Sequence, residues 1–255
     1  MQPPSPNRPF RQVTPNRKQP SLSQPLSQLP PPIIQIHNNT IIYPPPCTIP
    51  YITYIYNPSN NPTNKPKQQG VGWVTRKALS YATVTVNVHQ YADSENPTLI
   101  HVDAQQVITG GIQGTKEERK LDWNEREHVD HIFGTLKGRS RLIAAAKGED
   151  GAVRPVIEFQ TKVGSSDADA KVQKFLTGET LIDGSKSEGF LAEEGEGAFL
   201  QSFVINESAG WTAEQVWGFE IIDGERRHTR RVVVVKNGKA ASARLVYAFK
   251  ERRAE

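Results

Sequence analysis

The sequence predicts an all-β protein, an antiparallel up-and-down β-barrel that follows a disordered N-terminal extension. Three observations lead to this prediction. The composition changes abruptly at Gly70, short runs of strand-forming residues recur from there to the C-terminus, and two tight turns join the last runs into a meander. A β-sandwich built from the same strands is an alternative that the sequence leaves open.

The extension comprises residues 1–69. It contains no Gly, Ala, Asp, Glu or Trp, yet it holds 17 of the 19 prolines. Such a segment cannot bury enough apolar surface to offset the entropy of the chain, so we expect it to be disordered and residues 70–255 to form the barrel domain. The run of Ile and Tyr over residues 33–56 is interrupted by four prolines, so we expect no helix that crosses a membrane there.

Charge and cysteine content exclude several classes of protein. The extension has six Lys and Arg and no acid, so the remainder has 25 cations against 27 acids, a net charge of −2. No basic stripe is left on the folded part, and we expect no nucleic-acid partner. The single cysteine, Cys47, lies in the extension, and no charged-then-apolar leader precedes it. We therefore expect a cytoplasmic protein without disulfides.

Strand-like runs recur along the barrel domain. In the first of them Val84, Val86 and Val88 alternate with polar residues, as in a strand with one buried face. Gly110–Gly114 is read as a turn, residues 178–197 as a flexible loop, and residues 167–175 as the best candidate for a short helix. The strand-like runs before the C-terminal meander cover residues 79–91, 98–108, 134–145, 154–163 and 200–206.

The meander spans Glu214 to Lys250. Asp223-Gly224 and Asn237-Gly238 are typical of two-residue type I′ turns, in which both central residues need positive φ. Such turns also fix the register, so the facing pairs can be predicted. We expect Phe219 opposite His228, Trp217 opposite Arg230, His228 opposite Tyr247 and Arg230 opposite Leu245.

The two faces of this meander differ in composition. The inward face collects Gln215, Trp217, Phe219 and Leu245, with Arg226, His228, Arg230 and Tyr247 set among them. The opposite face carries Glu214, Glu220, Arg227, Thr229, Arg231, Ser242 and Arg244, and we expect it to face solvent. An apolar surface with a few polar groups is typical of a ligand-binding site. Two readings of Arg230 remain open: a structural plug stacked on Trp217, or a group that contacts a ligand.

Other catalytic or metal-binding patterns are weak. His128 and His131 lie in an acid-rich block, residues 122–134, but residues three apart on a strand point to opposite sides. We therefore expect a salt-bridged loop there and no metal. No Gly-x-Ser-x-Gly motif occurs, and the only cysteine lies in the extension, so a nucleophilic triad is not expected.

Three blocks of sequence carry a resemblance to a known family. Over roughly residues 72–249 the chain resembles a family of fungal lipocalin-like proteins that includes the PydY-like pericyclases. The blocks are Asp122-Trp123-x-Glu125-x-Glu127-His128-x-Asp130-His131-x-Phe133-Gly134, Gly210-Trp211-Thr212-Ala213-Glu214-Gln215-x-Trp217-Gly218-Phe219 and Arg226-Arg227-x-x-Arg230. The resemblance implies a lipocalin-like barrel and a small hydrophobic, polyketide-like ligand from secondary metabolism.

The implied activity is a cofactor-free pericyclic cyclisation of the Diels–Alder type. Arg230, His228 and Tyr247 are then the candidate catalytic residues, and Gln215, Trp217, Phe219, Leu245 and Trp123 are the candidate ligand-binding residues. Two other functions stay open. The barrel could carry a small hydrophobic molecule without changing it, or His228 could act as the general base of an isomerase or dehydratase.

Overall fold

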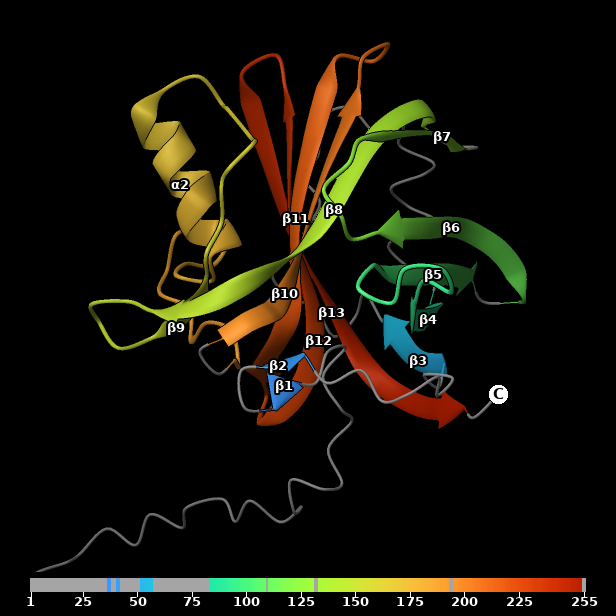
Figure 1. Cartoon of the computed structure of the whole chain (residues 1–255). Coiled ribbons are helices and arrows are strands. Elements are labelled where there is room, and N and C mark those ends of the chain that lie inside the picture. The colour runs from blue at the N-terminus through green and yellow to red at the C-terminus, as the bar shows by residue number, and fades with distance from the viewer. Residues whose placement is uncertain are drawn as a thin grey trace, which may run out of the picture. The chain divides into compact units, whose positions relative to one another are not determined.

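The computed structural model describes residues 36–37, 40–41, 51–56, 83–108, 110–130, 133–192 and 195–253 (Figure 1). The fold lies within the compact unit of residues 31–255. Its elements are β1 (Ile36–His37), β2 (Thr40–Ile41), β3 (Tyr51–Tyr56), β4 (Val84–Ala92), β5 (Ile100–Ile108), β6 (Ile112–Lys120), β7 (Arg126–Asp130), β8 (Gly134–Lys147), β9 (Val153–Pro155), α2 (Ser166–Leu176), β10 (Gly195–Asn206), β11 (Trp211–Ile222), β12 (Glu225–Lys236) and β13 (Lys239–Arg253).

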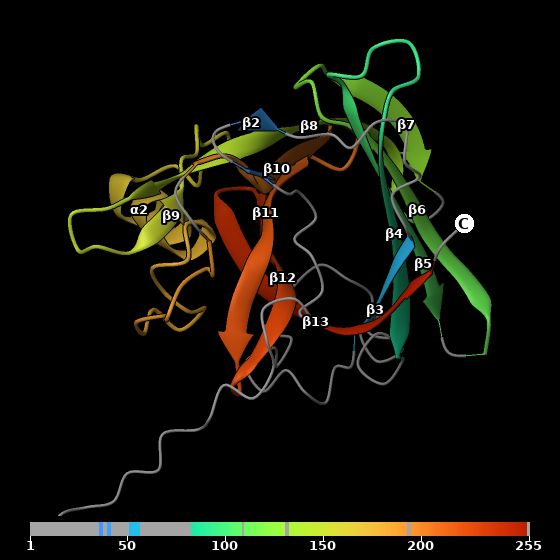
Figure 2. The ribbon, with the colours of Figure 1, turned by 60° about the horizontal axis from the view of Figure 1, so that its bottom comes forward.

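One antiparallel sheet makes up most of this structure. Its strands follow the order β6-β5-β4-β3-β13-β12-β11-β10-β8-β7, and β9 pairs with the end of β8. Neighbours in the sheet are consecutive strands in the sequence, with two exceptions: the early strand β3 pairs with the last strand, β13, and β10 pairs with β8 across the intervening β9 and α2. Figure 2 shows these strands curving around a common centre. The prediction of an antiparallel up-and-down barrel is confirmed.

The sheet comes near to closing between its first strand, β6, and β8, the strand next to the terminal β7. Asp122, just after β6, forms an isolated bridge with Arg141 of β8. The backbone N–H of Trp123 donates to the carbonyl of Ser140 at 2.9 Å. Inside the barrel, the guanidinium of Arg119 donates to the hydroxyl groups of Ser140 and Ser202, at 3.1 and 2.6 Å. Backbone and side chains thus nearly close the barrel along this seam.

The predicted register of the meander is confirmed. Trp217 pairs with Arg230 and Phe219 with His228 across the first turn, and His228 pairs with Tyr247 and Arg230 with Leu245 across the second. Asp223 and Asn237 have φ of 54° and 51°, and the glycine after each is also positive. Both central positions of each turn therefore adopt the left-handed conformation that type I′ turns require.

The sheet over β8, β10, β11 and β12 is buried on both faces. Its inner face contributes Leu200 and Trp217 to a core cluster that fills the barrel. The other members of this cluster include Tyr247 of β13, Ile52 and Tyr54 of β3, and three valines of β4. Its outer face packs Val216 and Val233 against helix α2 and the segments around it, in a second cluster. Helix α2 agrees with the expected helix at 167–175, and its N-cap Ser165 accepts a hydrogen bond from the N–H of Ala168.

The outer face of the meander is not the solvent-facing surface that its charges suggested. Glu214, Thr229 and Arg231 have no exposed area, and Glu220 is 2% exposed. Their buried polar groups all have partners: Glu220 pairs with Arg231 and Arg244 on the same face, whereas Glu214 and Arg231 also bind the segments that cover it. The two oxygens of Glu214, for example, accept hydrogen bonds from the backbone N–H groups of Gln160 and Thr161, the nearest at 2.8 Å. Residues 156–163, expected to continue a strand, instead cross this face as an irregular segment, and only β9 pairs.

The expected boundary at Gly70 also needs correction. Residues 51–56 fall within the predicted extension, yet they form β3 and pair with both β13 and β4. Ile52 and Tyr54 of this strand are buried in the barrel core. Their alternating apolar side chains stabilise a strand despite the proline-rich surroundings. The expected disorder of the rest of residues 1–69 concerns positions outside the described part of the chain, apart from the short strands β1 and β2.

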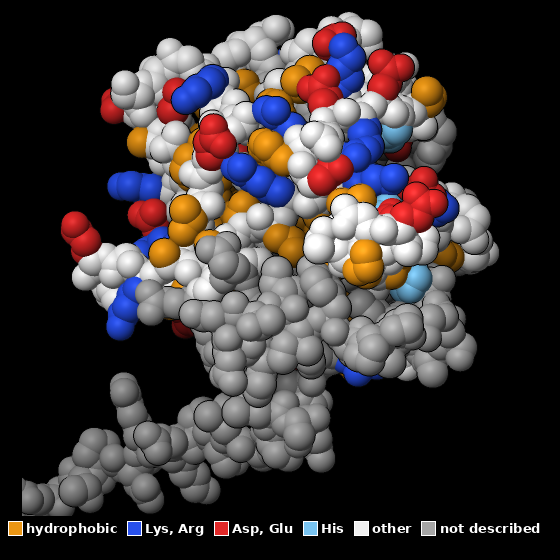
Figure 3. Space-filling view, in the orientation of Figure 1, with side chains coloured by type: hydrophobic (Ala, Val, Ile, Leu, Met, Phe, Trp, Pro, Cys, Tyr) orange, Lys and Arg blue, Asp and Glu red, His pale blue; other side chains and the backbone are white. Residues whose placement is uncertain are grey.

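The outer surface mixes both signs of charge. Figure 3 shows Lys and Arg side chains interspersed with Asp and Glu over the face turned to the viewer. Within the described ranges, no helix combines the length and the apolar character that crossing a membrane would require.

Candidate functional site

The inner faces of β11, β12 and β13 bring most of the predicted site residues together. Trp217 comes from β11, His228 and Arg230 from β12, and Tyr247 from β13. All four are at most 5% exposed. Two type I′ turns hold the three strands in register, so these side chains project into the barrel from adjacent positions.

The guanidinium of Arg230 lies over the ring of Trp217. The guanidinium carbon is 3.6 Å from the centre of the indole ring and 5.4 Å from that of Tyr247. Its Nη1 donates to both oxygens of Glu117 on β6, at 3.3 Å. Stacking on a ring and pairing with a carboxylate together restrict the rotation of a long side chain, so the orientation of Arg230 is well defined.

Glu117 is shared between two arginines. Its Oε2 also accepts hydrogen bonds from Arg119, from Nη2 at 2.9 Å and from Nε at 3.3 Å. Burial raises the pKa of Glu117, but the adjacent Arg230 and Arg119 outweigh it and lower the pKa from 4.5 to about 2. Glu117 is therefore ionised at neutral pH, at the centre of an Arg–Glu–Arg cluster inside the barrel.

His228 sits among aromatic rings. Its ring centre is 4.8 Å from that of Tyr54, 5.4 Å from Tyr247, 5.6 Å from Phe219 and 6.1 Å from Trp217. Burial in this apolar surrounding, with the nearby Arg230 and Arg226 adding to it, holds the pKa of His228 well below 6.5. The imidazole is therefore neutral at physiological pH.

Several buried polar atoms in this region lack a hydrogen-bond partner in the part of the chain that the structure describes. They are Nε and Nη2 of Arg230, Nε2 of His228 and the hydroxyl of Tyr54. A buried polar group without a partner costs stability, so such atoms are rare in folded proteins and concentrate at functional positions. Here they gather around one arginine and one imidazole of the barrel interior.

The remaining interior candidates line the same region. Phe219 and Leu245 face inward, with Phe219 8% exposed and Leu245 packed against the barrel core. Gln215 is bound to Trp217, whose Nε1 donates to its Oε1 at 3.1 Å. This hydrogen bond orients the indole ring beneath Arg230.

Trp123 does not join this group. It adopts a φ of 62° at the barrel seam, and its ring stacks under the guanidinium groups of Arg139 and Arg141, at 4.7 and 4.1 Å. Those arginines alternate along β8 with Ser140, which faces the interior, so Trp123 lies on the outer side. Its contacts indicate a structural role in closing the seam.

The acid-rich block at 122–134 forms a salt-bridged loop and the strand β7. Arg126 makes two hydrogen bonds to the carboxylate of Asp122, at 2.6 and 2.7 Å, and His128 is exposed. His131 lies outside the described residues. Among those that are described, no group of three or more His, Cys, Asp or Glu side chains is placed to hold a metal ion.

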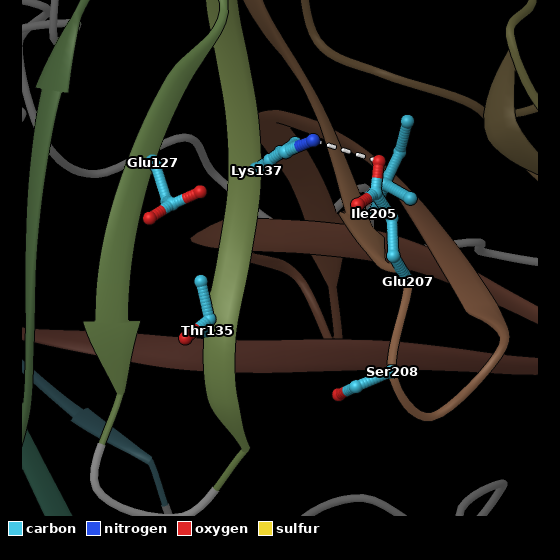
Figure 4. Close-up of a pocket in the computed structure, with 6 residues that line it drawn as sticks. All are labelled: Glu127, Thr135, Lys137, Ile205, Glu207 and Ser208. Carbon is cyan, nitrogen blue, oxygen red and sulfur yellow. Dashed lines mark hydrogen bonds and ion pairs between the residues drawn. The ribbon is translucent and has the colours of Figure 1, made fainter.

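A surface pocket nearby shares no residue with the interior site. It lies on the outer side of β8 and β10 and is lined by Glu127, Thr135, Lys137, Ile205, Glu207 and Ser208 (Figure 4). Lys137 and Glu207 pair across it at 2.8 Å, and both remain partly exposed. An exposed pair of this kind contributes little binding energy, and we assign the pocket no role.

Sequence reasoning missed three members of the interior site. Glu117 and Arg119 belong to β6, where the run Lys116-Glu117-Glu118-Arg119-Lys120 has no apolar residue to mark the inward face. Tyr54 belongs to β3, within the segment assigned to the extension. For Tyr54 a signal exists, because the six residues of β3 are all Ile, Tyr or Thr.

Comparison with known proteins points to one kind of enzyme. The chain is 27% identical over 181 residues to the probable pericyclase scpY of Mollisia scopiformis, and 28% identical over 181 residues to the pericyclase pydY of an Acremonium species. Each alignment covers 71% of this chain, and 78% and 80% of the respective relative. Over these 181 residues the chain is similar to pericyclases of the PydY kind. No protein-family model matches it, and no solved structure matches it significantly.

Proposed function

We propose that this protein is a cofactor-independent pericyclase with a lipocalin-like barrel, acting on a small hydrophobic, polyketide-like molecule of secondary metabolism. The observation that carries the proposal is Arg230, a buried guanidinium held against Trp217, whose Nε and Nη2 have no hydrogen-bond partner among the described residues. The names of the two relatives support the same reaction class.

The chemistry asked of the barrel is mostly positioning. In an intramolecular cycloaddition, a flexible polyene folds until its diene and dienophile touch, and two new σ bonds form at the expense of two π bonds. No proton or electron leaves the substrate. Orientation of the reacting groups supplies on the order of 7–11 kcal/mol of barrier reduction in favourable cases. Trp217, Phe219 and Leu245 offer the apolar walls against which such a chain would fold.

Arg230 would add electrostatic stabilisation. A carbonyl conjugated with the dienophile gains electron density as the bonds form, and a fixed donor aimed at its oxygen stabilises that charge. Arg230 is oriented before any substrate arrives, because Glu117 and Trp217 hold it. His228 and Tyr247 lie beside it and provide further polar atoms for the substrate.

The electrostatics of His228 argue against the isomerase or dehydratase alternative. A general base works best when its pKa lies near the operating pH. Burial among aromatic rings lowers the pKa of His228 well below 6.5, which makes its imidazole a weak base. A neutral imidazole is better suited to accept or donate a hydrogen bond than to abstract a proton from carbon.

A test needs only the purified full chain and a synthetic substrate. A linear polyene that carries a terminal diene and a conjugated enone cyclises slowly in buffer, and both its rate and its ratio of diastereomers can be followed by chromatography. We expect the protein to accelerate the reaction and to favour one diastereomer. Arg230→Met should lose about 10- to 100-fold of the acceleration, whereas Arg227→Met, on the other face of β12, should keep it.

The same assay separates the enzyme from a carrier. A carrier would bind the polyene, seen as quenching of tryptophan fluorescence, and leave its rate and its diastereomer ratio as they are in buffer. That result, obtained with several chain lengths, would refute the pericyclase proposal.

A further inference from the structure

The unpartnered atoms of Arg230 lie on one edge of its guanidinium. Nη1 is occupied by Glu117, while Nε and Nη2 are buried and have no partner among the described residues. In a guanidinium group, the N–H bonds of Nε and Nη2 on their shared edge are parallel and lie in one plane. This edge is the two-pronged donor that binds two oxygens at once.

The surrounding charges do not balance. Arg119 and Arg230 are both cations, and Glu117 is the only carboxylate in the described chain that pairs with either of them. The cluster therefore has a net charge of +1, and the side chain of Arg230 is only 3% exposed. A buried charge without a counter-charge is costly, so the site is complete only when an anion joins it.

Arg119 is not available for that role. Its Nη1 donates to the hydroxyl groups of Ser140 and Ser202, and its Nε and Nη2 donate to Glu117. These partners come from three different strands and hold Arg119 at the barrel seam. The ligand-facing charge is therefore that of Arg230.

We propose that the ligand presents a planar anion with two oxygens, a carboxylate or the enolate of a β-dicarbonyl, to the Nε–Nη2 edge of Arg230. The assignment rests on the proposed function only in placing the ligand inside the barrel. A single neutral carbonyl would occupy one of the two donors and leave the charge uncompensated. A planar anion satisfies both donors and neutralises the cluster, and it anchors one end of the hydrophobic chain while the rest folds against Trp217 and Phe219.

Paired probes test this assignment with the full-length chain. One pair is trans-parinaric acid, a polyenoic carboxylic acid whose fluorescence reports binding, and its methyl ester. The other is a long-chain acyl cyclic β-dione, which is ionised at neutral pH, and its enol methyl ether, followed by calorimetry. Each pair keeps its apolar chain and changes only the charge. The pairs together distinguish a carboxylate from an enolate as the preferred anion.

We expect the wild-type protein to bind at least one anionic probe about 10- to 100-fold more tightly than its neutral partner, the difference expected of charge-assisted hydrogen bonds. Arg230→Met should reduce this preference to less than about twofold. Arg230→Lys keeps the charge and removes the fork, so it should retain only part of the preference. Arg227→Met, on the same strand but the outer face, should behave as wild type.

The anion assignment can fail independently of the proposed function. Equal binding of anionic and neutral probes, no binding of either anion, or a preference that survives in Arg230→Met would overturn the assignment. Accelerated cyclisation of a neutral polyene without any charge preference would leave the pericyclase proposal intact and refute the anion. A strong anion preference without any acceleration would support the anion assignment and refute the pericyclase proposal.

Discussion

Arg230 and Arg231 are neighbours on β12 and both are buried, yet their surroundings differ. Arg231, on the outer face, makes a hydrogen bond from every guanidinium nitrogen: to Glu220 from Nε and Nη2, to the carbonyls of Phe175 and Thr180 from Nη1, and to the hydroxyl of Ser187 from Nη2. Arg230, on the inner face, uses one nitrogen, with Glu117 as partner.

This difference separates a structural arginine from a functional one. Arg231 connects the strand to α2 and to the loop that follows it, and its hydrogen bonds compensate the cost of burial. Arg230 keeps two donors unused at a cost in stability. Proteins retain such costs where function needs them. Substitutions on the two faces should therefore separate stability from activity.

The largest effect is expected for Arg231→Met. It leaves Glu220 without its main counter-charge and leaves two backbone carbonyls and a hydroxyl without a donor, in a region with almost no exposed area. Removing one partner of a buried ion pair typically costs about 3–5 kcal/mol. Urea denaturation should show this loss in the free energy of unfolding.

Arg227→Met is the matched control on the same face of β12, because the ion pair of Arg227 among the described residues is with the largely exposed Glu225. We expect a loss of less than about 1 kcal/mol there. Similar losses for the two variants would mean that Arg231 does not connect the helix segment to the barrel as its contacts indicate.

Glu117→Gln should have the second-largest effect on stability. It leaves the buried guanidinium of Arg230 and the partly buried one of Arg119 without a carboxylate between them, at a cost of about 2 kcal/mol. Glu118→Gln, one residue along β6 with a side chain that is 64% exposed, is the control and should be close to neutral.

The pH dependence sharpens this prediction. The folded protein lowers the pKa of Glu117 from 4.5 to about 2, so its contribution to stability is present above pH 4.5 and is lost as pH falls toward 2. Glu117→Gln should therefore flatten the acid limb of the stability curve. An unchanged acid limb would show that Glu117 is not the buried ion-pair partner of the two arginines.

The sequence was sufficient to predict the inner face of the meander. One Asp-Gly turn and one Asn-Gly turn set the register of the three strands by local geometry. The alternation of side chains along each strand then determined which residues share a face, including His228, Arg230 and Trp217. Local turn chemistry needs no knowledge of the rest of the fold.

The partners of these residues could not be predicted in the same way. Glu117 is 113 residues from Arg230, and only closure of the barrel brings them together. The prediction that the outer face of the meander is exposed was wrong because charged residues usually face solvent. Here helix α2 and the segment at 156–163 cover this face and supply hydrogen-bond partners. Strand β3 was missed because the prolines around it outweighed its six strand-forming residues.

The contribution of His228 to stability is smaller, and we expect it to appear as a pH dependence of the free energy of unfolding. The unfolded chain takes up a proton on this imidazole below pH 6.5, but the folded state holds its pKa well below that value, mainly through burial. The unfolded state then binds more protons, so the free energy of unfolding should fall as pH is lowered from 6.5, by about 1 kcal/mol for the first pH unit. His228→Gln should remove this slope, and the same change at the exposed His128 should leave it. A slope that persists in His228→Gln would place its origin elsewhere.

The smallest effect on stability is expected for Arg230→Met, in contrast to the neighbouring Arg231→Met. The methionine keeps much of the stem that packs on Trp217, and the two unpartnered donors disappear with the guanidinium. Glu117 keeps Arg119 as its counter-ion, so the cluster changes from a net charge of +1 to a neutral pair. We expect the free energy of unfolding to change by less than about 1 kcal/mol, or to rise, while ligand binding or turnover is lost. A loss as large as that of Arg231→Met, with binding intact, would mean that Arg230 is a structural plug of the barrel, and the contrast between the two faces of β12 would disappear.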